Sequence, residues 1–257
     1  MSLLSIQDLS KNFGGLAAVS NVNIELENNE LVGLIGPNGA GKTTLFNLLT
    51  GVYVPSSGEV KMTTEKGEVL LNGKEPSVIN ELGLARTFQN IRLFGNLTVL
   101  DNVLVALHTK HGANFWASVL RTPSFYRNRQ ELEERAIELL RIFNLQDLVK
   151  EKAKNLPYGQ QRRLEIVRAL ATEPKILFLD EPAAGMNPNE TAELTELIRQ
   201  IQKDFDITVV LIEHDMSLVM NVCERIYVLE YGKLIAHGTP SEIQQNPAVI
   251  KAYLGGE

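Results

Sequence analysis

The sequence has little of several features that would assign a protein to a class at once. It contains 1 cysteine among 257 residues, so no intramolecular disulfide can form, and an oxidising compartment is not indicated. Basic residues are outnumbered, 25 Lys and Arg against 31 Asp and Glu, which gives a net charge of −6. A protein that binds nucleic acid over a broad surface needs a positive field, so this balance leaves room only for a local basic patch.

Long apolar runs are also absent. The longest, such as residues 207–212, have the length of a strand, whereas a helix that crosses a bilayer needs about 20 apolar residues. Residues 1–5 lack the basic start and long apolar segment of a signal peptide. We therefore expect a protein of the cytosolic side that takes part in membrane processes only through partner chains.

The apolar patterns that are present predict an α/β fold. With 44% hydrophobic and 22% charged residues, the composition is that of a globular domain. Near-continuous apolar runs at 31–35, 176–179 and 207–212 indicate parallel strands covered by helices on both faces. Alternating patterns within residues 1–30 and 58–72 indicate antiparallel strands that flank this parallel sheet.

A helical segment interrupts these strands. Between residues 131 and 144, five apolar side chains fall on one helical face: Leu132, Ala136, Leu139, Leu140 and Phe143. We therefore expect a discontinuous core, residues 1–83 and 173–257, that carries an inserted α-helical subdomain at residues 84–172.

A glycine-rich loop connects the strand at 31–35 to an apolar helical run, and it fits the pattern G-x-x-x-x-G-K-[ST]. Glycines let several backbone N–H groups converge on phosphate oxygens, and the start of the helix adds partial positive charge. Lys42 would reach the β- and γ-phosphates, and the Thr43 hydroxyl would bind Mg²⁺. The predicted phosphate-binding residues are Gly36, Pro37, Asn38, Gly39, Ala40, Gly41, Lys42, Thr43 and Thr44.

Two further buried runs end in side chains that suit phosphate chemistry. Asp180 follows the run at 176–179 and would hold Mg²⁺ through a water. Glu181 would polarise an attacking water, which predicts a hydrolase, with a solvated surface glutamate as the alternative. His214 follows the third run and would hydrogen-bond the γ-phosphate or that water, with a structural histidine as the alternative.

Together, these three strand ends and the helical insertion resemble the nucleotide-binding subunits of ABC transporters, over essentially the whole chain. The resemblance implies ATP hydrolysis, with ATP and Mg²⁺ as ligands. It implies that Phe13 stacks on adenine, with a core aromatic as the alternative. It further implies that Gln89 contacts Mg²⁺ and leads to the surface that the membrane subunits contact, and that His214 is the switch histidine.

The segment that matches the family's signature departs from its usual spelling, Leu-Ser-Gly-Gly-Gln. Here residues 156–160 read Leu-Pro-Tyr-Gly-Gln. The resemblance implies a head-to-tail dimer in which Tyr158, Gly159 and Gln160 contact the nucleotide of the opposite subunit. Pro157 lacks the hydroxyl and the N–H of the usual serine, so it would weaken the partner's site rather than the one built on Lys42. In a heterodimer with an intact partner signature, we expect the Lys42 site to be the more competent.

Residues 184–187 match the loop that crosses the dimer interface, with Asn187 in place of the usual aspartate. Asn187 is also predicted to cap a helix that starts at Pro188, because Glu190 follows three residues later.

A finer resemblance, to the LivG-type ATP-binding subunits of branched-chain amino acid importers, rests on residues 86–89, 122–125, 158–166 and 246–255. It implies a LivF-type second ATPase or a second copy of this chain as dimer partner. It also implies two membrane-spanning subunits, an external solute-binding protein as an indirect partner and no nucleic acid. The chain would then be peripheral on the cytoplasmic side of the plasma (inner) membrane.

Three other classes of ATP-binding protein share part of this pattern. The ATPase of lipopolysaccharide export has a similar tail, but the longer insertion around Trp116 argues against it. A soluble nucleic-acid-associated or ribosome-associated ABC ATPase would need two heads in one chain or long heptad repeats, and neither is visible. A small-molecule kinase does not account for Glu181, His214 and the Gln160 motif together.

Overall fold

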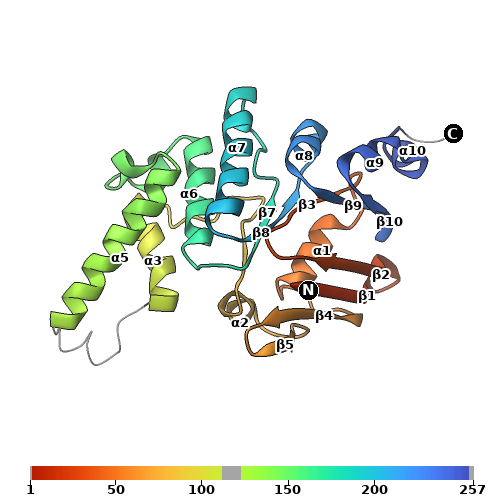
Figure 1. Cartoon of the computed structure of the whole chain (residues 1–257), viewed down its shortest axis with the longest axis horizontal. Helices are drawn as coiled ribbons and strands as arrows, with labels where there is room; N and C mark the ends of the chain where they lie inside the picture. Colours follow the sequence, from red (N-terminus) through yellow and green to blue (C-terminus); the bar gives the residue numbers. More distant parts are fainter. Residues whose placement is uncertain (1, 112–122, 255–257) are drawn as a thin grey trace. The chain divides into compact units, whose positions relative to one another are not determined.

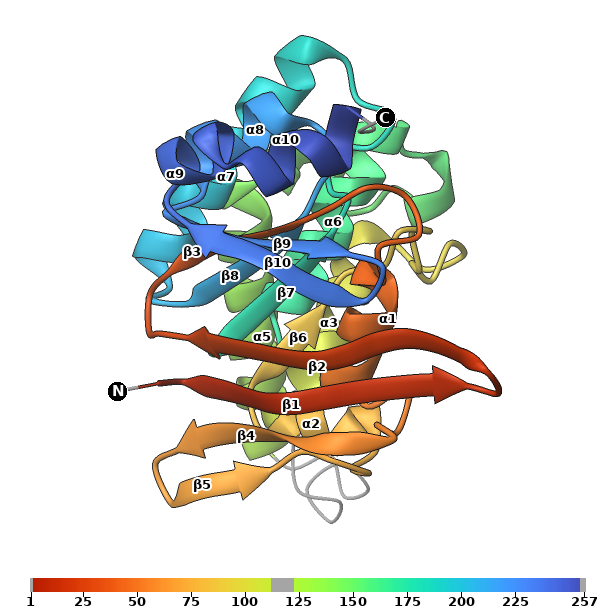
Figure 2. The ribbon, with the colours of Figure 1, turned by 90° about the vertical axis from the view of Figure 1, so that its right-hand side faces the viewer.

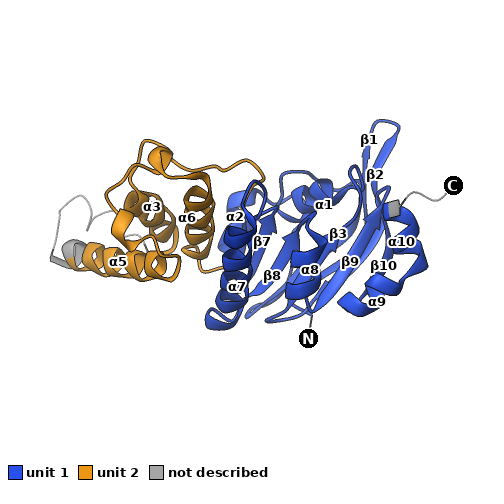
Figure 3. Cartoon of the chain, turned by 90° about the horizontal axis from the view of Figure 1, so that it is seen from above, with its two compact units in different colours: residues 1–86, 175–257 blue, residues 87–174 orange. Residues whose placement is uncertain are grey.

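The computed structural model describes residues 2–111 and 123–254. It divides into two compact units, Met1–Arg86 with Lys175–Glu257, and Thr87–Pro174 (Figure 3). Trp116, which distinguishes the predicted insertion, lies outside the described residues. Among the described residues, no helix is both long enough and apolar enough to cross a membrane.

The first unit contains a 4-stranded antiparallel sheet, seen as one layer in Figure 2. Its strand order is β2-β1-β4-β5. The bounds are Leu4–Phe13 for β1, Leu16–Leu26 for β2, Ser57–Thr64 for β4 and Gly67–Leu70 for β5. Side chains along β2 alternate between buried and exposed, which is the pattern that predicted these antiparallel strands.

The same unit holds a 6-stranded sheet in the order β10-β9-β3-β8-β7-β6, parallel except for the pair β9 and β10. Its strands are β3 (Leu31–Ile35), β6 (Leu84–Arg86), β7 (Ile176–Asp180), β8 (Thr208–Ile212), β9 (Arg225–Glu230) and β10 (Lys233–Gly238). Every residue of β3, β7 and β8 is buried, as their continuous apolar runs predicted. Because these three strands are parallel neighbours, their carboxyl ends meet at one edge of the sheet.

Strand β6 was not predicted. The residue pattern predicts that the helical segment starts at about residue 84, but Leu84–Arg86 pairs in parallel with β7 and belongs to the first unit. A strand of 3 residues is too short to produce a recognisable apolar period. The helical unit therefore starts after Arg86 rather than at residue 84.

Helix α1 (Lys42–Leu49) packs in the core between the two sheets. Its buried side chain Phe46 meets Phe178 of β7 edge to face, with ring centroids 4.8 Å apart, and Ile6 and Ile24 of the antiparallel sheet belong to the same core. Burying one such side chain contributes about 1.5–3 kcal/mol. This packing holds α1 in place. Because Lys42 is the first residue of the helix, the loop before it is held in place as well.

The remaining helices of the first unit lie near the 6-stranded sheet or come after its last strand, β10, along the chain (Figure 1). Asn187 caps α7 as predicted: its side chain accepts from the Glu190 N–H, and the Glu190 carboxylate accepts from the Asn187 N–H. The buried residues of α7 are Leu194, Ile198, Ile201 and Gln202. The helices are α2 (Pro76–Glu81), α7 (Pro188–Asp204), α8 (Met216–Val222), α9 (Pro240–Gln245) and α10 (Pro247–Leu254).

The second unit is helical in its described residues. It contains α3 (Val99–His111), α5 (Pro123–Ile142), the short 3-10 turns η1 (Gln146–Leu148) and η2 (Ala153–Asn155), and α6 (Tyr158–Leu170). The five apolar residues predicted to share one face of α5 and its extension are all buried. The side chains of Pro123 to Tyr126 lie outside the described part of the chain.

Candidate functional site

The loop between β3 and α1 has a backbone that requires glycine at two positions. Gly36 and Gly41 have φ angles of 150° and 100°, in the region that L side chains rarely adopt. A Cβ atom on Gly36 would lie 2.1 Å from the Leu229 carbonyl oxygen, and one on Gly41 would lie 2.5 Å from the Ala18 carbonyl oxygen. The loop is therefore held tightly between β2 and β9 and presents its backbone where side chains would not fit.

Lys42 is the first residue of α1 and is 6% exposed. Its Nζ donates to the carbonyl oxygens of Gly36, at 2.6 Å, and Pro37, at 3.1 Å, so it lies folded over the loop. Burial lowers the pKa of Lys42, while the nearby carboxylates of Glu181 and Asp180 oppose that shift. The Lys42 ammonium therefore lies close enough to Asp180 and Glu181, at the carboxyl end of β7, for their negative charges to act on it.

Asp180, the last residue of β7, is 1% exposed and makes an ion pair with Arg86 of β6. The Arg86 Nη2 atom lies 2.7 Å from Asp180 Oδ2, and its Nη1 atom donates to Asn47 Oδ1 of α1 at 2.6 Å. Sequence reasoning missed this partnership because the two residues are 94 positions apart and β6 itself was not recognised. The carboxylate is held in a fixed orientation at the strand edge.

Glu181 and His214 come together although they leave different strands. The His214 Nε2 atom lies 2.7 Å from Glu181 Oε1, and the Glu181 N–H donates to the Ile212 carbonyl at 2.9 Å. Glu181 has a φ of 49°, which is strained for a residue with a side chain, and such strain concentrates at functional sites. The His214 side chain is 47% exposed, whereas the Glu181 side chain is only 15% exposed, so water reaches the pair from the His214 side.

Phe13, at the end of β1, is 43% exposed and therefore not a core aromatic. Tyr53, which follows α1, packs its ring against Phe13 at right angles, with centroids 5.3 Å apart and an interplanar angle of 77°. Lys11 Nζ lies 5.2 Å from the centre of the Phe13 ring. This cluster offers an exposed aromatic surface of the kind on which a base stacks.

The remaining predicted residues belong to the second unit. Gln89 lies in the chain segment before α3, and Tyr158, Gly159 and Gln160 form the first turn of α6, with Pro157 at the N-cap position. Arg162, fully buried, donates to the carbonyl oxygens of Phe88 and Gln89 at 2.6 and 2.8 Å, and pairs with Glu165 at 2.8 Å. Inside this unit, a buried ion pair therefore ties the Gln89 segment to the helix that starts with the signature residues.

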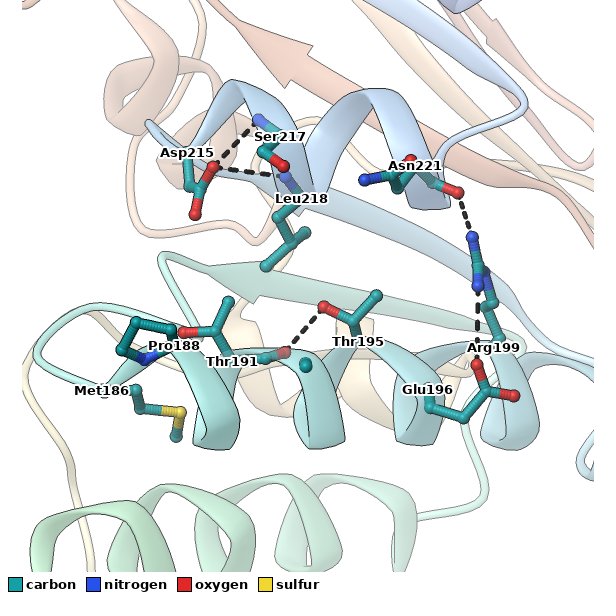
Figure 4. Close-up of a pocket in the computed structure, with 11 residues that line it drawn as sticks. Met186, Pro188, Thr191, Thr195, Glu196, Arg199, Asp215, Ser217, Leu218 and Asn221 are labelled. Carbon is teal, nitrogen blue, oxygen red and sulfur yellow. Dashed lines mark hydrogen bonds and ion pairs between the residues drawn. The ribbon is translucent and has the colours of Figure 1, made fainter.

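A separate hollow of about 530 Å³ lies between α7 and α8 (Figure 4). Its polar groups make local bonds: Asp215 accepts from the N–H groups of Ser217 and Leu218, Thr195 donates to the Thr191 carbonyl, and Arg199 contacts the Asn221 carbonyl. These bonds cap the start of α8, stabilise α7 from within and join α7 to α8. The hollow is distinct from the strand-edge cluster.

Family models match most of this chain. The model of the ABC transporter family matches residues 19–184. The chain belongs to the ABC transporter family. A second model, described as branched-chain amino acid ATP-binding cassette transporter, matches residues 233–257, which include β10, α9 and α10. ABC transporter ATP-binding subunits hydrolyse ATP to power transport, so the predicted class of enzyme is confirmed.

Curated relatives of this ABC subunit confirm the finer resemblance. It is 49% identical over 253 residues to the high-affinity branched-chain amino acid transport ATP-binding protein LivG of Escherichia coli, with 98% of each chain covered. It is 47% identical, with the same coverage, to BraF of Pseudomonas aeruginosa, which carries the same description. The lipopolysaccharide export system ATP-binding protein LptB of Haemophilus influenzae is more distant, at 32% identity with 99% and 98% coverage.

Solved structures confirm the α/β fold class. The crystal structure of the ADP conformation of an ATP-binding cassette of an ABC transporter matches with a TM-score of 0.84 at 30% identity, covering 100% of both chains. A dimeric cassette in a post-hydrolysis state, bound to ADP and Pi, matches with a TM-score of 0.76 at 25% identity. That match covers 92% of this chain and 98% of the other.

Proposed function

We propose that this ABC subunit binds ATP and Mg²⁺ on the loop before Lys42 and hydrolyses ATP to drive the import of branched-chain amino acids. The observation that carries the catalytic part is the meeting of Lys42, Asp180, Glu181 and His214 at the carboxyl edge of β3, β7 and β8. The solute class is supported by the similarity to LivG and BraF and by the matched tail.

In the proposed site, ATP phosphates would lie on backbone N–H groups of residues 36–44, except that of Pro37, which has no N–H to donate. Lys42 Nζ, which bonds to two loop carbonyls, would exchange them for β- and γ-phosphate oxygens. The start of α1 adds its partial positive charge to the same place. Phe13 would receive the adenine on its exposed face, with Tyr53 holding the ring by its edge.

The donor set suits Mg²⁺. No group of three or more His, Cys, Asp or Glu side chains in the described part of the chain could hold a metal by itself. Mg²⁺ prefers one or two protein oxygens together with waters and substrate phosphates. Thr43 and Asp180, the latter through water, are the proposed protein partners on the first unit, and Gln89 is the proposed partner on the second. When bound, the ion neutralises charge on the phosphate oxygens.

Glu181 is the proposed general base. Its carboxylate would accept a proton from water as the water oxygen attacks the γ-phosphorus, and the bond from that phosphorus to the leaving ADP oxygen would break. His214, 2.7 Å away, would orient the carboxylate and the water. Lys42 would stabilise the charge that develops on the transferring phosphoryl group.

The proposed working unit is a head-to-tail dimer in which Tyr158, Gly159 and Gln160 reach the partner's ATP. Its second member would be a LivF-type ATPase or another copy of this chain. The dimer would lie on the cytoplasmic side of the inner membrane, bound to two membrane-spanning subunits and served indirectly by an external solute-binding protein. Pro157 stands at the N-cap of α6. Because proline has neither a hydroxyl nor an N–H, we expect it to weaken the partner's site.

The catalytic assignment is tested with Glu181→Gln, using the exposed Glu138→Gln as the matched charge control. We expect Glu181→Gln to bind a fluorescent ATP analogue with unchanged affinity and to lose phosphate release, while the control stays at the wild-type rate. Retained hydrolysis in Glu181→Gln would refute the assignment of the base.

The solute assignment needs the native membrane complex. The complex is purified with its binding protein, reconstituted in vesicles, and offered radiolabelled leucine, with aspartate as competitor. We expect uptake of leucine that depends on ATP and resists aspartate. ATP hydrolysis without leucine uptake would leave the ATPase intact and exclude this solute.

A further inference from the structure

Glu213, the residue between β8 and His214, is 4% exposed, and none of the roles above uses it. Its Oε1 atom accepts from the Ala183 N–H at 2.8 Å, and its Oε2 atom accepts from the His214 N–H at 3.1 Å. Both carboxylate oxygens are therefore engaged by the backbone of two different loops.

These bonds connect the segments that carry the base and the switch histidine. Ala183 lies two residues after Glu181 and 30 positions before Glu213 in sequence. The Glu181 N–H already bonds to the Ile212 carbonyl at 2.9 Å, and the two side chains meet at 2.7 Å. The Glu213 carboxylate adds a buried bridge between the same two loops, besides the direct contact of Glu181 with His214.

Burying a carboxylate is unfavourable, because the charged form loses its hydration. Burial accordingly raises the pKa of Glu213, against the opposing effect of its backbone hydrogen bonds. An apolar side chain would fill a buried position at the end of a strand without that penalty. The geometry gives a reason for the carboxylate: only a side chain with two acceptor oxygens satisfies N–H groups from both loops at once.

We propose that Glu213 is a positioning residue that sets the distance between Glu181 and His214 by clamping the backbone of their two loops. The proposal rests on the proposed function, in which Glu181 and His214 act on the attacking water. A displacement of about 1 Å in such a pair lowers turnover by up to roughly 100-fold. Nucleotide affinity depends on the Lys42 loop, which Glu213 does not contact in any of these hydrogen bonds.

The first test is Glu213→Gln, which keeps the size of the side chain and replaces one acceptor oxygen with an NH₂ donor. Whichever way the amide is oriented, one backbone N–H loses its acceptor. We expect kcat for ATP hydrolysis to fall roughly 10- to 100-fold, with KM for ATP within about twofold of wild type. The control is Glu242→Gln, which removes a capping carboxylate from α9, where it accepts from the Thr239 N–H at 2.8 Å. The glutamine can still accept from the Thr239 N–H through its amide oxygen, so this control should leave both the melting temperature and kcat close to wild type.

A double-mutant cycle separates positioning from general destabilisation. If Glu213 acts through the Glu181–His214 pair, Glu213→Gln should lower kcat by less than about twofold in a His214→Ala background. Fully multiplicative losses, or a wild-type kcat in the single variant, would overturn the proposal. Loss of turnover in Glu181→Gln with a normal Glu213→Gln would overturn this inference alone, whereas retained turnover in Glu181→Gln would overturn the proposed function.

A measurement on the wild-type protein covers the case in which Glu213→Gln does not fold. Amide hydrogen exchange reports whether the bridge is formed, because a buried, bonded N–H exchanges only when the structure opens. We expect the Ala183 amide to be protected as strongly as amides in β8. Exchange of Ala183 at least 100-fold faster than that of Leu211 would show that the bridge is open and would refute the proposal.

Discussion

The Nε2 atom of His214 lies 2.7 Å from the Oε1 atom of Glu181, across the carboxyl ends of two adjacent parallel strands. We therefore predict that His214→Ala lowers kcat by about 10²- to 10⁴-fold, the usual effect of losing a group that assists proton transfer. Affinity for ATP should stay within about twofold, because the phosphate contacts come from the Lys42 loop.

Phosphate release and equilibrium nucleotide binding measure the two quantities separately. The exposed His108 of α3 provides a control, since His108→Ala should leave both unchanged. A parallel loss of affinity and turnover in His214→Ala would instead mean that His214 contributes to ground-state binding.

The second prediction concerns the buried pair of Arg162 and Glu165 in the helical unit. Arg162→Met leaves the Glu165 carboxylate and the carbonyls of Phe88 and Gln89 without their cationic partner. Breaking one side of a buried ion pair lowers the free energy of unfolding by about 3–5 kcal/mol. Urea denaturation should show this loss. The double change Arg162→Met with Glu165→Leu should recover only part of it, because the N–H groups of Phe88 and Arg92 then lose Glu165 Oε1 as their acceptor. A loss below about 1 kcal/mol in Arg162→Met would show that the pair is unimportant for stability.

Asn187 caps α7, and the family resemblance also implies that it lies at the dimer interface. Unfolding of the isolated subunit tests the capping role alone. Asn187→Ala removes the acceptor for the Glu190 N–H, and loss of such a cap lowers stability by about 1 kcal/mol. Asn187→Asp keeps the acceptor and should leave the free energy of unfolding within about 0.5 kcal/mol of wild type. Thermal and urea unfolding of the isolated subunit test both values. A stabilised Asn187→Ala variant would contradict the cap.

Much of this site could be predicted because its signals are local. The loop before Lys42 combines a residue pattern with a strand before it and a helix after it. The strand β3 could be recognised from its continuous apolar run, which agrees with the burial of all its positions. Asp180 and Glu181 were recognisable for the same reason, directly after a buried run. The neighbouring order of β3, β8 and β7 then places those ends together.

The contacts that hold the site could not be predicted, because they join residues distant in sequence. Arg86 meets Asp180 only through β6, a strand too short to show a period. Glu213 follows a strand and precedes a histidine, a position that predicts a solvated carboxylate, yet folding encloses it with the Ala183 N–H. Sequence patterns therefore predicted the residues that are proposed to contact ATP and water. They did not predict the residues that hold those side chains in position, such as Arg86 and Glu213.

The last prediction uses Cys223, whose Sγ atom packs toward Gly33 of β3, where a Cβ on Gly33 would lie 3.1 Å from it. Burial raises the pKa of this thiol to about 12, and only the thiolate reacts readily with disulfide reagents. At about pH 8 we expect the native protein to resist labelling and the guanidinium-unfolded protein to react at once with one equivalent. Rapid labelling of the native protein would contradict the burial.

The same shift fixes the direction of a pH effect on stability. Between the ordinary thiol pKa of 9.0 and the native value of about 12, the unfolded chain loses the Cys223 proton while the folded protein keeps it. The unfolded state therefore binds fewer protons, and the free energy of unfolding falls as pH rises through this window, by up to about 1.4 kcal/mol per pH unit. In Cys223→Ala this component should be missing, so the stability difference between variant and wild type should shift in favour of the variant above about pH 9. Urea unfolding of both proteins at a series of alkaline pH values measures that difference, and a difference independent of pH would show that the thiol ionises equally in both states.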